Sequence, residues 1–79
     1  MSENWWNPRR DRLWNRYWRS AMAIMMAELS YEDLKLLDQM GIEHVLMTAD
    51  QLRSEPDNIL SAVASVTEAF QMLKMELLL

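Results

Sequence analysis

The sequence predicts an all-α protein, a small helical bundle of about four helices. We expect long first and last helices that pack together, with two short helices between them. Apolar residues recur every three or four positions, which is the spacing of one helix face, and capping residues precede the apolar segments. Only one glycine and two prolines occur in 79 residues, of which 51% are hydrophobic, so connections should be short. This length allows one domain at most. We expect an aromatic arm over residues 1–7 and one helical domain over residues 8–79.

The first helix is predicted to begin at Asn7-Pro8, where asparagine caps the helix and proline occupies its first position. It should extend to about Leu29, because no glycine or proline interrupts it. A broad aromatic and aliphatic face then lies opposite the charged residues. We expect five residues of this face to pack into the core: Tyr17, Trp18, Ala21, Ile24 and Met25.

A short second helix is predicted from the cap at Ser30, which is followed by acids in the first turn. Leu34, Leu37 and Met40 should face inward. Gly41 then ends the helix, and the apolar Ile42 after it suits a Schellman-type stop.

Residues 42–54 allow two interpretations. Their apolar residues follow helical spacing, which fits one bent helix. Thr48–Gln51, however, has the pattern of a capping box, which indicates a break and a restart. We favour two short turns of helix in this region.

The last helix should begin at Ser54 or within Glu55–Asp57, close to Pro56. Its three-and-four repeat predicts one narrow apolar seam, with small residues beside it that permit close helix packing. Because three heptads are short for an independent coiled coil, we favour a wall of the bundle over a dimer seam. The seam comprises Ile59, Val63, Val66, Phe70, Leu73 and Leu77, flanked by Ala62, Ala64 and Ala69.

Charge is divided unevenly along the chain. Residues 1–20 hold five arginines against two acids, a net +3, whereas residues 21–79 hold three basic residues against ten acids, a net −7, which together give −4. In a helix, four of the arginines fall within roughly 80° of one another. We call this set the arginine face: Arg9, Arg12, Arg16 and Arg19. A solvated face usually mixes residue types, whereas arginine alone favours planar contacts with carboxylate or phosphate.

Tryptophans accompany the arginine face. Trp5 and Trp6 precede the helix and have no periodic partner, Trp14 borders the face, and Trp18 is expected to be structural. Tryptophan and arginine are enriched at binding hot spots. The predicted partner-binding residues are therefore Trp5, Trp6, Arg9, Arg12, Trp14, Arg16 and Arg19. The last three leucines cannot all face inward, so another chain should cover part of that end.

No catalytic constellation is visible. His44 is the only histidine, and its neighbour Glu43 does not share its helix face, so the two do not form a catalytic dyad. His44 is expected at the surface. The chain has no cysteine for a disulfide or thiolate metal site, and Gly41 is its only glycine, so no phosphate-binding loop exists. We therefore expect a non-enzyme without metal or cofactor. The lack of cysteine gives no mark of an oxidising compartment, so a cytoplasmic location is expected, and neither a secretory signal nor a membrane span is evident.

Three functions fit these features. The favoured one is a protein-binding module, such as an accessory subunit, adaptor or inhibitor, whose arginine face meets an acidic surface on a larger protein or on another copy. The alternative is nucleic-acid binding by the same arginines, although an acidic domain is unusual for that role. Attachment to a membrane surface is third, because the apolar face of the first helix is needed to build the core.

Overall fold

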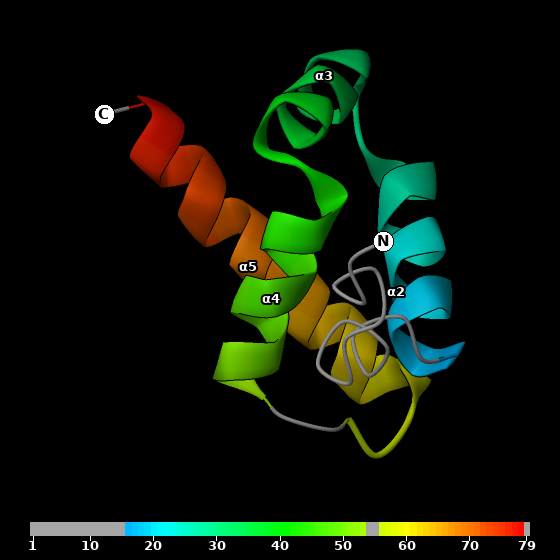
Figure 1. The fold of residues 1–79 in the computed structure, drawn as a ribbon. Helices are drawn as coiled ribbons and strands as arrows, with labels where there is room; N and C mark the ends of the chain where they lie inside the picture. The colour runs from blue at the N-terminus through cyan, green and yellow to red at the C-terminus, as the bar shows by residue number, and fades with distance from the viewer. Residues whose placement is uncertain (1–15, 54–55, 79) are drawn as a thin grey trace, which may run out of the picture.

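The computed structural model describes residues 16–53 and 56–78. Over these ranges the chain forms four helices: α2 (Arg16–Glu28), α3 (Tyr31–Met40), α4 (Ile42–Leu52) and α5 (Ile59–Leu78) (Figure 1). The predicted all-α bundle is confirmed, and its first described helix, α2, packs against its last, α5. The expected aromatic arm, and the expected helix start at Asn7-Pro8, lie outside the described residues.

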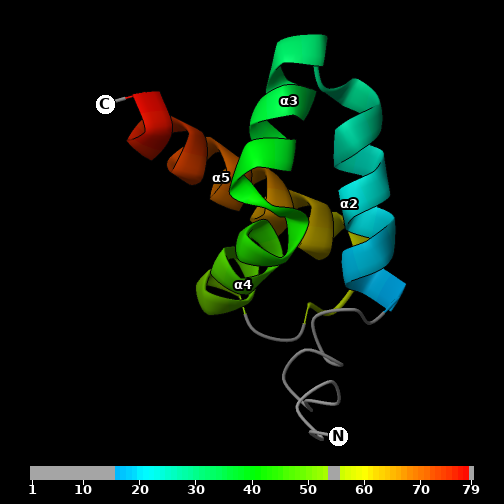
Figure 2. The same ribbon diagram turned by 45° about the horizontal axis from the view of Figure 1, so that its top comes forward.

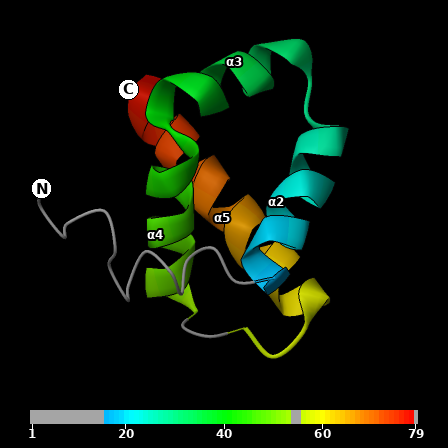
Figure 3. The same ribbon diagram turned by 45° about the vertical axis from the view of Figure 1, so that its right-hand side comes forward.

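The core lies where α2 and α4 pack against α5, which stands between them in Figure 3. Trp18 from α2 and Phe70 from α5 are its largest fully buried side chains. Val45 and Leu46 of α4, with Val66 of α5, fill the remaining space. The prediction that Trp18 is structural is therefore confirmed. Large aromatic side chains bury more apolar area per residue than aliphatic ones, so Trp18 and Phe70 make large individual contributions to the stability of this core.

The buried face of α2 is narrower than predicted. Ala21 and Met25 are buried and Tyr17 is half-buried, as expected, but the Ile24 side chain is 43% exposed. The residues that meet the core follow a stripe through Trp18, Ala21, Met22 and Met25. Ile24 is turned by more than about 90° from the middle of that stripe, so α5 does not cover it.

The N-terminal cap of α3 is confirmed. Ser30 accepts a hydrogen bond from the Asp33 amide at 3.1 Å, and two acids stand in the first turn. Leu37 is buried, whereas Leu34 and Met40 are half-buried. The side of α3 that was expected to face inward therefore meets the rest of the bundle over a limited area.

Gly41 ends α3, but the stop is not the predicted Schellman turn. Its φ of 91° is positive, as expected for glycine, whereas its ψ of 133° is far from the left-handed helical value. Its amide donates to the Leu37 carbonyl at 2.9 Å, and its carbonyl accepts from Val45 at 3.3 Å. This extended geometry leads directly into α4, so α3 and α4 join with almost no connecting segment (Figure 2).

The predicted break within residues 42–54 is wrong, because α4 is one continuous helix from Ile42 to Leu52. The Thr48 hydroxyl donates to the His44 carbonyl at 3.0 Å, which is a bond within a helix and not a cap. Val45, Leu46 and Ala49 form an unbroken buried face that holds the helix against α5.

The start of α5 also differs from the prediction. The side-chain oxygen of Asn58 accepts from the Ser61 amide at 2.8 Å, so Asn58 caps the helix instead of Ser54 or Glu55–Asp57. The middle of the seam is confirmed as a wall of the bundle, since Val66 and Phe70 are fully buried within one chain. Leu77 lies outside that wall, with 52% of its side chain exposed.

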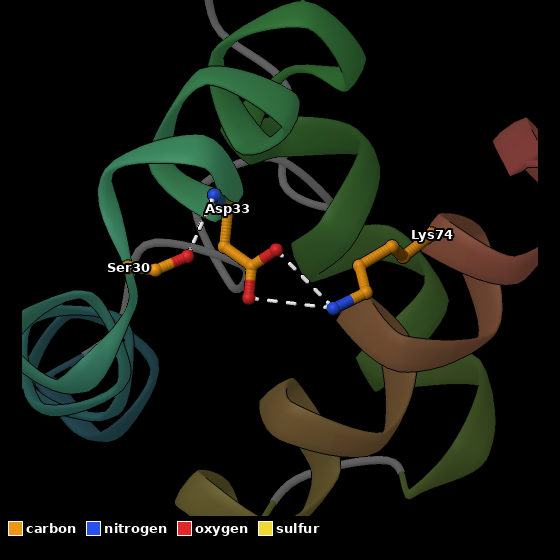
Figure 4. A network of polar contacts seen from close by, with 3 residues as sticks. All are labelled: Ser30, Asp33 and Lys74. Carbon is orange, nitrogen blue, oxygen red and sulfur yellow. Dashed lines mark hydrogen bonds and ion pairs between the residues drawn. The ribbon is translucent and has the colours of Figure 1, made fainter.

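An ion pair ties α3 to α5. The Lys74 ammonium donates to both carboxylate oxygens of Asp33, at 3.2 and 3.3 Å (Figure 4). The same ammonium lies 5.9 Å from the centre of the Phe70 ring. Asp33 also supplies the amide that bonds to Ser30. One residue therefore closes the first turn of α3 and anchors it to α5.

Candidate protein-binding surfaces

The outer face of α2 is exposed to solvent along the described part of the helix. Arg19, Ser20, Ala23 and Ala27 are all exposed and lie within about 100° of one another, opposite the core stripe. Arg16 begins α2 one turn before Arg19. The described helix is therefore two-sided as predicted, with an arginine on its outer side and small residues continuing that side toward Glu28.

Most of the predicted binding residues cannot be placed. Trp5, Trp6, Arg9, Arg12 and Trp14 lie outside the described residues. Of the arginine face, Arg16 is placed as part of α2 and Arg19 as an exposed side chain. A guanidinium keeps its charge and presents five donors in a plane, so an exposed Arg19 suits a carboxylate or phosphate on another molecule.

The outer face of α5 was not predicted as a surface. Six of its exposed residues share one stripe along the whole helix and none of these six is charged, although the exposed Glu68 lies directly beside the stripe. We call this set the outer stripe: Leu60, Ala64, Thr67, Gln71, Met75 and Leu78. The exposed fractions of Leu60, Met75 and Leu78 are 77%, 65% and 70%. Apolar residues on two opposite sides of a helix indicate that both sides are covered, so this signal was present in the sequence.

Two shallow grooves flank the turn between α3 and α4. The first has a volume of about 320 Å³ and is lined by Met26, Leu34, Leu37, Asp38, Gly41 and Ile42. The second, about 340 Å³, is lined by Met40, His44, Leu73, Glu76 and Leu77. Both are mainly apolar, and they suit side chains of a partner better than a polar substrate.

The second groove brings His44 and Glu76 to one place. Helical periodicity does not reveal this neighbourhood because the two residues come from α4 and α5. His44 is exposed, as predicted. The groove offers an imidazole and a carboxylate, but none of the five residues that line it carries a hydroxyl or thiol nucleophile. Across residues 16–53 and 56–78, no three carboxylate or imidazole side chains gather as metal ligands.

Comparison with known proteins identifies no relative: no protein-family model, curated protein or solved structure matches the chain. Among the described helices, none combines the length and apolar character that crossing a membrane requires. The exposed surfaces of α2 and α5 are therefore the features of the described residues that bear on function.

Proposed function

We propose that the chain is a small non-catalytic protein-binding module that docks through the arginine face at its N-terminal end. Its partner is a larger protein with an acidic surface. In that role the chain serves as an accessory subunit, adaptor or inhibitor of an assembly, and it needs no cofactor.

One observation supports this function above the others: α2 buries its inner face in the core and exposes the Arg19 side chain on the opposite side. The core fixes the orientation of the helix, so an arginine on its outer side is held by a rigid support. Such pre-organisation reduces the entropy lost on binding. Three small residues lie on the same side of α2 and allow a partner to approach the helix closely: Ser20, Ala23 and Ala27.

Charge supports a protein partner over nucleic acid. The body of the chain carries a net −7 over residues 21–79, and α4 exposes Glu43 in its first turn. Acids on that scale repel a phosphate backbone, whereas an acidic protein surface needs to meet only the arginine face. The arginines also draw an acidic partner into register, because complementary charge speeds encounter and fixes orientation.

The test uses the full chain, affinity-tagged and recovered from its native source with and without nuclease. A companion protein that survives nuclease is then purified and titrated against wild type and the Arg12/Arg16/Arg19→Glu variant. We expect the variant to keep its helical circular dichroism and to lose measurable binding. A companion that disappears with nuclease would instead place the arginines on nucleic acid.

A matched pair of single variants separates position from charge. Arg19→Glu and Arg53→Glu make the same change at two exposed residues, one on α2 and one directly after the end of α4. We expect Arg19→Glu to weaken binding at least about tenfold and Arg53→Glu to change it less than about twofold. Equal losses would mean that only net charge matters, and that the arginine face is not the contact.

A further inference from the structure

The outer stripe of α5 is unusual for an exposed helix face. α5 has 20 residues and only three charges, at Glu68, Lys74 and Glu76. None belongs to the outer stripe, and the Lys74 ammonium is engaged by Asp33. Solvated helix faces normally carry charge, and an uncharged stripe with leucine at both ends marks an interaction site.

We propose that a second copy of the chain covers the outer stripe, so that two α5 helices pair antiparallel about a two-fold axis close to Ala69. Ala69 itself is buried on the inner face, and the axis passes the helix on its opposite side. This interface does not involve the arginine face, and it is independent of the function proposed above.

The sequence of the outer stripe is self-complementary in this register. Leu60 meets the partner's Leu78 at each end of the interface. Ala64, the smallest residue of the stripe, meets the partner's Met75, so a small side chain faces a long flexible one. Near the axis Thr67 meets the partner's Gln71, and the hydroxyl and the amide are able to hydrogen-bond. A two-fold axis makes each contact twice, as closed dimers require.

A parallel pair lacks this match. It places Ala64 against Ala64 and Met75 against Met75, which leaves a gap at one level and crowding at another. Antiparallel packing also points the dipoles of the two helices in opposite directions, which is electrostatically favourable. Size and polarity along the stripe therefore favour the antiparallel arrangement.

The contact is modest in size. The stripe is roughly 27 Å long at 1.5 Å per residue and about 10 Å wide, which gives a footprint on the order of 300 Å² per copy. Stable complexes bury about 800 Å² per partner, so this dimer belongs to the weak class. We expect half of the chains to be paired near about 0.1 mM.

Charge gives the interface a distinctive salt response. The two-fold axis places the same side of both antiparallel helices on the same side of the pair. Glu68 lies beside the outer stripe and near the axis, so the Glu68 residues of the two copies come close together. The two Glu68 carboxylates therefore repel, and each copy also carries a net −4. Added salt should strengthen the dimer. Self-association through arginines on the acidic body should weaken with salt instead.

Sedimentation equilibrium of the full chain, from about 10 µM to about 1 mM, tests the proposal. We expect a monomer–dimer equilibrium in which Ala64→Glu or Met75→Glu weakens pairing at least about tenfold. Ala27→Glu is the matched control, because it makes the same change at an exposed alanine of α2 and should leave pairing unchanged. Circular dichroism and thermal unfolding check that each variant is folded.

Mixing wild type with Glu68→Lys adds a second readout, because the flanking repulsion becomes attraction. We expect dimers of one wild-type and one Glu68→Lys chain to form more often than random pairing of the two chains predicts. A chain that is monomeric throughout, a dimer that survives both Ala64→Glu and Met75→Glu, or a dimer that salt weakens would overturn the proposal. A dimer that salt weakens would indicate self-association through the arginines, whereas the function proposed above is tested by binding to a separate protein.

Discussion

The two faces of α5 both carry apolar residues but have opposite surroundings. On the inner face Ala62, Val66, Ala69 and Phe70 are fully buried by α2 and α4. On the outer face Leu60, Met75 and Leu78 are more than half exposed. Packing within the chain explains the apolar residues on the inner face, whereas it does not explain those on the outer face. The difference shows that α5 carries more apolar surface than one chain of this size is able to cover.

Phe70→Ala should break the inner face and have the largest effect. Phe70 is fully buried, and removing a buried aromatic ring typically costs about 3–5 kcal/mol. Such a loss is comparable to the whole stability expected for a small domain, so urea unfolding should show a largely unfolded chain. The matched variant on the outer face is Leu60→Ala, which we expect to change the unfolding free energy of the monomer by less than about 0.5 kcal/mol. Similar losses at both positions would contradict the distinction between the faces.

Gly41→Ala tests the turn that directs α4 onto the inner face. An added Cβ meets no atom within 4 Å, so any loss comes from the backbone, whose φ of 91° and ψ of 133° suit glycine alone. We expect a loss of about 1–3 kcal/mol by thermal or urea unfolding. A neutral result would show that the joint between α3 and α4 relaxes to an ordinary turn.

Asn58→Ala tests the cap of α5. Its side chain satisfies the Ser61 amide, and loss of such a cap typically costs about 1 kcal/mol. Asn58→Asp keeps the acceptor and should restore the stability to within about 0.5 kcal/mol. If both variants unfold alike, the measured loss does not come from the cap.

Met75→Ser should have the smallest effect on folding and a clear effect on pairing. Met75 is 65% exposed, so the dilute monomer should lose less than about 0.5 kcal/mol. Wild type should unfold at a higher temperature when its concentration is raised, because dimerisation stabilises the folded chain. We expect that concentration dependence to be weaker in Met75→Ser. Identical melting behaviour in the two proteins would remove Met75 from the interface.

Sequence reasoning succeeded where one local signal decides the structure. Ser30 before two acids predicted the start of α3, and Gly41 predicted its end. It failed where one residue serves two roles equally well. The Thr48 hydroxyl is able to accept from an amide as a cap or to donate to His44 within a helix, and burial of Val45 and Ala49 settled the choice.

The surfaces were harder to predict than the helices. A three-and-four repeat identifies one seam, whereas the buried face of α5 also includes Ala62, Ser65 and Ala69. Leu77 and Ala64 were grouped with the seam, yet both are exposed, since the other helices do not reach that end or that side. Which apolar residues remain uncovered depends on where α2 and α4 pack, and periodicity along α5 carries no such information.

Disulfide cross-linking tests the pairing of the outer faces most directly, because the chain has no cysteine of its own. Leu60→Cys and Leu78→Cys are prepared separately, mixed and mildly oxidised, with Gln39→Cys on exposed α3 as the collision control. The antiparallel register brings residue 60 to residue 78 of the other copy and holds the two residues 60 roughly 27 Å apart. We expect the mixed 60–78 product well above the control and little 60–60 product. A predominance of 60–60 and 78–78 products, or mixed product at the control level, would contradict the account.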